Sequence, residues 1–275
     1  MKSTTRKFKR SLSIGAYVLF LLALMVKSIG LQAAASDNGT DVKAILERYA
    51  KDYETDVTFT KDVTFGVKVG ETFWTVVAKV KKEDAPASVK IIEGKPADPT
   101  YYFFTDAETL KKIDEGTINA LTASAKAFET DFAPFDVDVM EGYQPNENFM
   151  ADLLSVYFHF WTRGMPEVIP FGIDMTRTTH GAQAAVFYYQ PGFRSAYVAI
   201  KKGQHANKDE KSKTNPFPSM LVIIKGEGIA IINGKTLTIK AGQSIVIPPG
   251  VTHEFLNPEN DQPLEGILLM FGEGA

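Results

Sequence analysis

One histidine stands where side chains often do chemistry, directly after a tight turn that ends a strand. The stretch is GQSIVIPPGVTHEFLN, residues 242–257, and the histidine is His253. An imidazole there can bind a metal ion or hydrogen-bond a ligand, because its two ring nitrogens act as donor and acceptor. The chain has 4 histidines and no cysteine. Disulfides, thiolate metal sites and cysteine nucleophiles are therefore excluded.

Five residues of this stretch carry the spacing of a family motif. They are Gly242, Pro248, Gly250, His253 and Asn257. The glycines permit tight turns, the prolines end the strand, and the histidine then points inward. The stretch resembles the second motif of the cupin family. That resemblance implies an all-β jelly-roll barrel, and it makes a homodimer the expected assembly.

The first motif of the cupin family is degenerate in this chain. Counting back from Gly226 places Ser219 where the family has a glutamate, and KSKTNP stands where it has a His-x-His pair. The charged loop that follows Gly203 is also longer than the motif allows. Most of the metal ligands that the family uses are therefore missing from their usual positions.

A cupin metal site needs about three histidines and one carboxylate, a set that suits iron, manganese or nickel. This chain offers His253, with His205 as a second candidate ligand. Asp209 or Glu210 would add a carboxylate if the long loop folds inward. His180 is not expected to be a ligand, because it should lie at the surface or at a strand edge. We therefore expect a metal-free barrel, with a divalent transition metal as the alternative.

From about residue 170 the chain is predicted to be all-β, because short apolar runs alternate with glycine-containing turns. Asn233 and Gly234 give a strong signal for a two-residue hairpin. The expected barrel would enclose a pocket lined by six side chains, which are Tyr188, Tyr197, Met220, Ile223, His253 and Phe255.

Residues 40–145 are predicted to form an α+β domain. DVKAILERYAKDYE has apolar residues at helical spacing, and four β-rich runs follow. A capping box at Thr105 and Glu108 should open a helix that closes at Gly116, and NALTASAKAF should form a second short helix. This order resembles the sterol carrier protein type 2 fold, which implies an apolar tunnel for a lipid-like molecule.

The aromatic residues of this half have a simpler interpretation, because aromatic side chains dominate ordinary protein cores. We expect core roles for Phe65, Phe73, Trp74, Tyr101 and Phe103. Residues 146–169 are predicted to form a helix and a linker between the two domains. Its apolar stripe would leave His159 on the polar face of the helix.

The N-terminus has the order of a secretory signal peptide. A basic stretch precedes the apolar run 14–26, and the small residues Ala33 and Ala35 precede Ser36. The run is shorter than the about 20 residues that span a bilayer, and Lys27 interrupts any extension. We expect cleavage of residues 1–35 and export to a periplasm, a cell surface or the medium, with an uncleaved anchor as the alternative.

Two classes of function remain open. The first is an exported, non-catalytic binding protein with a cupin-like barrel over residues 170–275 and a lipid-binding-like domain. The second is a metal-dependent cupin enzyme, such as a dioxygenase, isomerase or decarboxylase. The missing ligands of the first motif favour the first class. A net charge of −3 gives no support to nucleic-acid binding.

Overall fold

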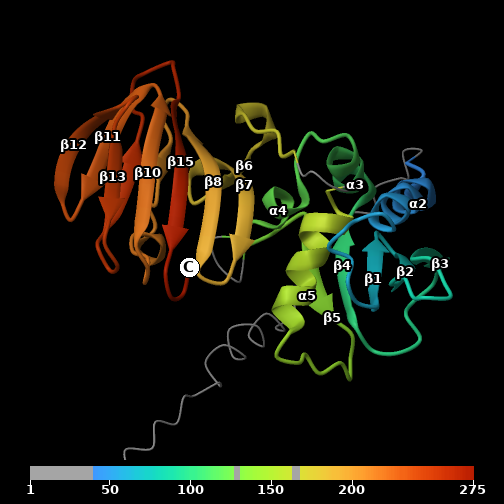
Figure 1. The fold of residues 1–275 in the computed structure, drawn as a ribbon. Coiled ribbons are helices and arrows are strands. Elements are labelled where there is room, and N and C mark those ends of the chain that lie inside the picture. The colour runs from blue at the N-terminus through green and yellow to red at the C-terminus, as the bar shows by residue number, and fades with distance from the viewer. Residues whose placement is uncertain (1–39, 127–130, 163–167) are drawn as a thin grey trace, which may run out of the picture. The chain divides into compact units, whose positions relative to one another are not determined.

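The computed structural model describes residues 40–126, 131–162 and 168–275 (Figure 1). The signal peptide predicted for residues 1–35 lies outside these ranges. None of the helices within them is long and apolar enough to cross a membrane. The fold is mixed: an α+β half comes first and a β-rich half follows, as the sequence predicts.

A five-stranded mixed sheet organises the α+β half, in the order β3-β2-β1-β4-β5. β1 and β4 run parallel, and the other neighbouring strands are antiparallel. A crossover through a loop therefore joins the first three strands to the last two. The strands are β1 Val63–Val69, β2 Thr72–Lys79, β3 Ser88–Glu93, β4 Tyr101–Thr105 and β5 Phe135–Val139.

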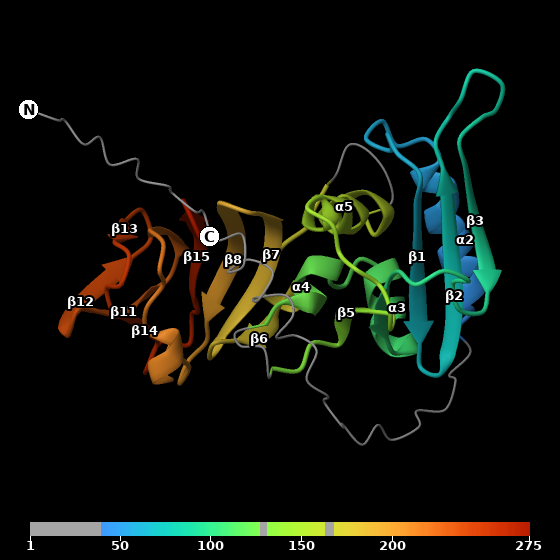
Figure 2. The same cartoon turned by 90° about the horizontal axis from the view of Figure 1, so that it is seen from below.

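The helix α2 (Val42–Tyr53) confirms the first predicted helix. It packs against the part of the sheet that β1–β3 form (Figure 2). The N-cap predicted at Thr105 is displaced by one residue, and Glu108 pairs with Lys112 at 2.6 Å instead of closing a capping box. Asp106 is the N-cap of α3 (Ala107–Asp114) and accepts a hydrogen bond from the Thr109 amide at 2.7 Å. Thr105 instead ends β4, and its hydroxyl donates to the carbonyl of Pro134 at 2.7 Å.

The second short helix is α4 (Ala120–Ser124), and its N-cap is Asn119. The predicted bridge helix is α5 (Phe149–Ser155), which continues into a π-helical turn, η2 (Val156–Phe160). A π-turn widens the helix by one residue per turn and so shifts the face that each side chain occupies. Both Phe158 and Phe160 are consequently buried.

Aromatic side chains fill the core of the α+β half. Phe65 and Phe103 are fully buried, and each makes edge-to-face contacts with rings from the α5–η2 segment. Trp74 and Tyr101 are also buried, which confirms the predicted core role for these four. Phe73 is half-buried and lies beneath the ammonium group of Lys95.

His159 is not on a solvent-facing polar stripe. Its Nδ1 lies 3.1 Å from Oδ2 of Asp56, whose side chain is completely buried. The other oxygen of Asp56 accepts hydrogen bonds from the amide and the hydroxyl of Thr58. This pair ties the loop after α2 to the π-turn, because a buried carboxylate needs such partners.

Two antiparallel sheets form the β-rich half. The six-stranded sheet has the order β13-β10-β15-β8-β7-β6, and the four-stranded sheet has the order β12-β11-β14-β9. The first contains β6 Arg177–Thr179, β7 Ala182–Gln190, β8 Phe193–Ile200, β10 Ser219–Lys225, β13 Ser244–Ile247 and β15 Leu264–Phe271. The second contains β9 His205–Ala206, β11 Glu227–Ile232, β12 Lys235–Lys240 and β14 His253–Leu256. Short 3-10 turns, η3 (Ile173–Met175) and η4 (Glu210–Ser212), lie in the connections.

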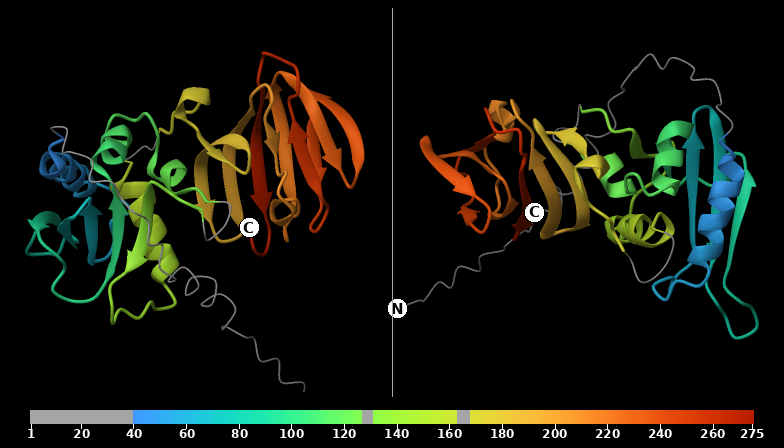
Figure 3. Two further views of the ribbon diagram at one scale, coloured as in Figure 1. Left: turned by 180° about the vertical axis from the view of Figure 1, so that it is seen from behind. Right: turned by 90° about the horizontal axis from the view of Figure 1, so that it is seen from above.

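The two sheets face each other (Figure 3), and side chains from both form one hydrophobic core. Leu221, Ile223 and Leu264 reach it from the six-stranded sheet, and Ala230 and Phe255 reach it from the four-stranded sheet. The predicted hairpin at the β11–β12 turn is confirmed, since Asn233 and Gly234 both have positive φ, 49° and 75°. A core shared by two facing sheets is the arrangement that a jelly-roll barrel requires.

Side chains from α4 satisfy the edge of β7. β6 pairs with β7 only from Ala182 to Ala184, so the next backbone groups of β7 lack a strand partner on that side. The amide of Val186 donates to the Thr122 hydroxyl at 2.8 Å, and its carbonyl accepts from Nδ2 of Asn119 at 2.8 Å. Polar caps of this kind protect an edge strand from unwanted pairing.

Candidate functional site

His253 begins β14 at the end of the turn that the sequence singled out. Gly250 takes a φ of 74° within that turn, which a glycine adopts without strain. The amide of His253 donates to the Lys213 carbonyl at 2.8 Å, and the amide of Gly250 donates to the Asn215 carbonyl at 2.8 Å. The imidazole is buried, with 4% of its residue area exposed.

The hydrogen bond of the His253 ring defines its tautomer. Nδ1 lies 3.1 Å from the carbonyl oxygen of Val251, which can only accept. Nδ1 therefore carries the proton, and Nε2 of the neutral ring is an acceptor. Burial lowers the pKa of His253, and the bond to Val251 opposes this only in part. The ring is thus neutral at pH 7 and offers one lone pair.

Three of the six predicted pocket residues face the space between the sheets. Phe255 and Ile223 belong to the core that the sheets share. His253 lies two positions before Phe255 on the same strand, so both side chains project from the same face. Their ring centroids are 6.2 Å apart. The structure therefore brings His253, Phe255 and Ile223 to the space between the two sheets.

The other three predicted pocket residues lie on the outer face of the six-stranded sheet. Met220 alternates with the inward-facing Leu221 on β10, so it points away from the core. Tyr197 packs in a separate cluster with Ala185 and Ala199, and its hydroxyl donates to Glu265 at 2.7 Å. Its cross-strand neighbours place Tyr188 on that same outer face. Successive side chains of a strand point to opposite faces of the sheet, so the register of each strand determines which of these residues face the core.

His205 and His253 are not brought together. β9 pairs His205 with Leu256, which faces outward since Phe255 faces inward. Nε2 of His205 lies 2.7 Å from Oε2 of Glu254, and Nζ of Lys213 lies 3.3 Å from the other oxygen. Burial acts to raise the pKa of Glu254, but the hydrogen bonds from His205 and Lys213 outweigh it, and the pKa is lowered.

The loop carboxylates do not complete a metal site. Oδ1 of Asp209 accepts from the Lys211 amide at 2.9 Å, and the exposed carboxylate of Glu210 pairs with Lys213 at 2.7 Å. Ser219 is fully buried, and its hydroxyl accepts from Nδ2 of Asn215 at 3.2 Å. Within residues 40–126, 131–162 and 168–275, no group of three or more histidines and carboxylates is placed to hold a metal ion. These side chains do not fit the donor set of a cupin metal site.

His180 is exposed, as expected, but it also lies near His253. It occupies the β6–β7 turn with a φ of 52°, and its carbonyl accepts from the Asn207 amide at 2.8 Å. Partial desolvation lowers the pKa of His180, Asp131 opposes the shift, and His253 adds to it when it is protonated. Sequence reasoning missed this neighbour, because the approach of the turn to β9 is a long-range contact.

Asn257 ends the motif as a structural clamp. Its side chain is fully buried, and Nδ2 donates to the carbonyls of Ile200, Asn260 and Gln262 at 3.0–3.1 Å. Its Oδ1 accepts from the Asn260 amide at 3.0 Å. The side chain thus folds the loop before β15 onto the end of β8. Its role is to hold the sheets at this end of the core.

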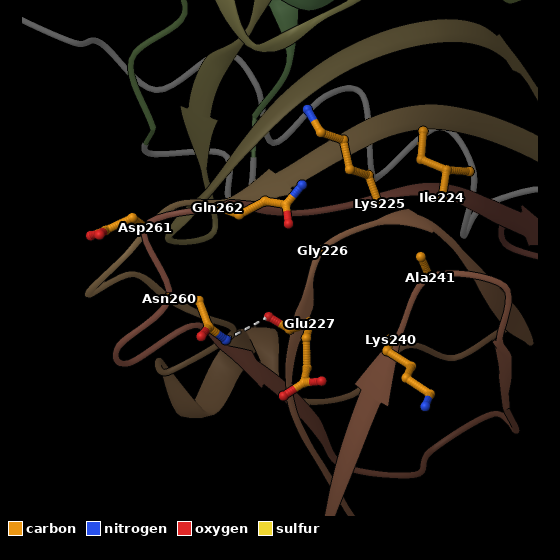
Figure 4. Close-up of a pocket in the computed structure, with 9 residues that line it drawn as sticks. All are labelled: Ile224, Lys225, Gly226, Glu227, Lys240, Ala241, Asn260, Asp261 and Gln262. Carbon is orange, nitrogen blue, oxygen red and sulfur yellow. Dashed lines mark hydrogen bonds between the residues drawn. The ribbon is translucent and has the colours of Figure 1, made fainter.

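An open hollow of about 580 Å³ lies at this same end, away from His253 (Figure 4). Its lining is mostly polar and includes Lys225, Glu227, Lys240 and Asn260. Glu227 begins β11, whereas His253 pairs with Ile232 at the other end of that strand. The charged side chains of the hollow are exposed to solvent. The acceptor Nε2 of the largely buried His253 ring is therefore the stronger candidate for specific recognition.

A comparison with family models finds a match in the β-rich half. Residues 197–270, from β8 to β15, match the family model described as Cupin domain. A Cupin 2 conserved barrel domain protein from Salinispora arenicola is 16% identical; the match covers 38% of this chain and 88% of that chain with a TM-score of 0.34. A predicted oxalate decarboxylase from Thermotoga maritima is 22% identical over 33% of this chain and 79% of that chain, with a TM-score of 0.30. A search of curated proteins finds no match.

Proposed function

We propose that this chain, whose residues 197–270 form a cupin domain, binds a small molecule without catalysing a reaction. The ligand would lie at the His253 end of the space between the two sheets, within a jelly-roll barrel. The observation that carries the proposal is the buried imidazole of His253. Its Nδ1 is committed to the Val251 carbonyl, so Nε2 presents a lone pair beside an apolar core.

The chemistry of that lone pair limits the ligand. A neutral imidazole with a protonated Nδ1 accepts at Nε2, so it recognises a hydroxyl or an N–H group. Phe255 and Ile223 supply apolar surface next to it. A small molecule that combines an apolar body with a donor group fits these two features. Because an acceptor that a bound ligand covers is costly to leave unpaired, the site would discriminate against analogues that lack the donor.

Non-catalytic binding is favoured over metal chemistry by the positions of the donors. His205 lies on the face opposite His253, and Ser219 takes the position of the family's glutamate. The metal-dependent enzyme remains the competing hypothesis and is an outcome of the test below. We also propose that the protein is exported, which rests on the signal-like order of residues 1–35.

The sterol-carrier resemblance supports a second proposal, that residues 40–145 contact a lipid-like molecule. Its support is the order of elements: a leading helix, three antiparallel strands, a crossover, and a fourth strand followed by two short helices. The buried aromatic residues of this half pack against one another. A lipid would thus have to enter beside this core, not in place of it.

Two substitutions of His253 separate ligand recognition from folding. In His253→Asn the amide nitrogen sits where Nδ1 was and keeps the bond to Val251, but the acceptor at Nε2 is lost. In His253→Gln the amide oxygen lies near Nε2 instead. His205→Ala, on the opposite face of the same sheet, is the matched control.

The assay is native mass spectrometry of protein purified gently from its host. We expect a retained small-molecule mass on the wild type and on His205→Ala, a weaker one on His253→Gln, and none on His253→Asn. A bound metal that is present in the wild type and lost in both His205→Ala and His253→Asn would contradict the proposal and support the metal-dependent enzyme. Identical adducts on all four proteins would place the ligand elsewhere.

A further inference from the structure

Strand β3 is an edge of the five-stranded sheet, because β2 is its only neighbour among the strands that the structure describes. The amide of Val89 points away from β2 and donates to Oε1 of Glu54 at 2.8 Å. The amide of Gly94, just after β3, points the other way and donates to the Phe73 carbonyl of β2 at 2.7 Å. Backbone groups alternate in direction along a strand, so the N–H and C=O groups of Ile91 also face away from β2.

Four main-chain groups on this edge have no hydrogen-bond partner in the part of the chain that the structure describes. They are the carbonyl of Val89, the amide and the carbonyl of Ile91, and the amide of Glu93. On β7, by contrast, side chains of α4 satisfy both backbone groups of Val186. An unpaired edge is a template for another extended chain, whose own donors and acceptors have the same spacing.

A groove of about 370 Å³ lies between this edge and helix α2. Four residues of one helical face line it, and Val89–Ile92 line it from the strand; the helical residues are Glu47, Ala50, Lys51 and Glu54. Ala50 and Val89 are buried, whereas Ile91 is only half-buried. The volume falls within the about 300–1,000 Å³ of ligand pockets. The edge of β3 therefore combines free backbone groups with space for side chains.

We propose that this groove binds an extended peptide segment of another protein, which adds to the sheet beside β3. A segment of five residues that runs antiparallel to β3 would make four main-chain hydrogen bonds, two of them with Ile91. Its central side chain would lie opposite Ile91, on the face of the sheet that packs against α2. An aliphatic side chain fits there, beside Ile91 and the methylene groups of Lys51.

The charges beside the groove favour basic residues on both sides of that central position. Glu93 projects from the same face of β3 as Ile91, since side chains alternate along a strand. The segment residue opposite Glu93 would pair with its carboxylate across the strands. At the other end, the carboxylate of Glu54 lies beside Val89. Lys51 lines the groove between the two ends and disfavours a cation at the centre. The segment recognised best is therefore basic, aliphatic and basic at alternate positions.

A second copy of β3 fits this edge less well. If two β3 strands paired antiparallel about Ile91, each Glu93 would lie opposite Val89 of the other copy. It would then approach Glu54, which already holds the Val89 amide. Like charges placed together across strands are destabilising. The proposal therefore commits to a partner protein, and self-pairing becomes an outcome of the test.

Fluorescence anisotropy of a labelled, end-capped peptide, Lys-Thr-Val-Thr-Lys, titrated with the full chain, tests the proposal. We expect saturable binding that weakens as salt is added, and at least about tenfold weaker binding of Glu-Thr-Val-Thr-Glu. Ile91→Pro removes an amide that donates to the segment and puts a ring in its place, so binding should weaken at least about tenfold. Proline is tolerated on an edge strand whose N–H faces outward. Ile91→Val keeps the amide and the apolar side chain, and it should bind within about twofold of the wild type.

Amide hydrogen exchange of the wild type, followed by NMR, makes the same test without a substitution. The peptide should slow exchange at Ile91 and Glu93 and leave Lys90 and Ile92 unchanged, because the latter two amides face β2. A wild type that does not bind the basic peptide would overturn the proposal. So would unchanged binding by an Ile91→Pro variant whose circular dichroism matches wild type. A wild-type dimer in which Ile91 is protected without peptide would assign the edge to a second copy and overturn the proposal as well.

Discussion

Replacing Asn257 by aspartate should destabilise the β-rich half without changing its shape. The two side chains are nearly isosteric, but the substitution removes the NH₂ group that donates to three carbonyls. The carbonyl of Ile200 is the most deeply buried of the three, while Asn260 and Gln262 are exposed residues whose carbonyls can be hydrated. An ionised carboxylate would in addition face these carbonyl oxygens.

The magnitude follows from the number of partners that lose a donor. Each buried acceptor left unsatisfied costs about 1–3 kcal/mol. One fully buried carbonyl, two partly hydrated ones and the repulsion of the new carboxylate together give a loss of about 2–4 kcal/mol at pH 7. Asn260→Asp is the matched control, because that side chain is exposed and makes a single hydrogen bond of 3.2 Å to the Glu227 carbonyl.

Urea unfolding followed by circular dichroism measures this difference. Burial among carbonyl oxygens would raise the pKa of the new carboxyl above its unfolded value of about 3.9. The folded state would then bind a proton more readily than the unfolded state, so the destabilisation should shrink as the pH falls through the raised pKa. If Asn257→Asp and the wild type unfold at the same urea concentration at pH 7, the side chain of Asn257 does not act as a structural clamp.

Three further predictions follow from the sequence and the site. N-terminal sequencing of exported protein should find a chain that begins at or near Ser36, and an intact Met1 in a membrane fraction would favour the anchor. Limited proteolysis should cut within residues 140–148 or 162–172, leaving a C-terminal piece with β-type circular dichroism. Burial lowers the pKa of His253 in the folded state, so as the pH falls this residue is protonated first in the unfolded chain. The free energy of unfolding should therefore fall below about pH 6.5, and it should fall less in His253→Asn.

Much of the fold can be predicted because the local signals are strong. The Asn233–Gly234 hairpin and the helix over Val42–Tyr53 follow from turn chemistry and apolar periodicity. The capping box at Thr105 shows the limit. Asp106 is as good an N-cap as threonine, and the choice between them depends on the hydrogen bond from Thr105 to the distant Pro134 carbonyl.

The candidate site could be predicted only in part. The motif spacing identified His253, and its burial is as expected. The direction of Tyr188, Tyr197 and Met220 was not accessible, because both faces of the six-stranded sheet are apolar and the alternation carries no signal there. The position of His205 depends on the short pairing of β9 with β14, which connects residues far apart in the sequence.

The π-turn explains why the helical stripe misplaced His159. A strict 3.6-residue period puts this side chain opposite the apolar residues, toward solvent. The wider turn over Val156–Phe160 rotates it toward the buried carboxylate of Asp56. Neither the π-turn nor the buried aspartate has a local sequence signature that periodicity would detect.

Metal content tests the central claim most directly. If His253 is a hydrogen-bonding group in a ligand site, elemental analysis of gently purified protein should find well under one tightly bound transition metal per chain. The His205→Ala and His253→Asn variants should give the same low value. One equivalent of iron, manganese, nickel or zinc in the wild type, lost on substitution of His253, would contradict the account and restore the metal-dependent enzyme.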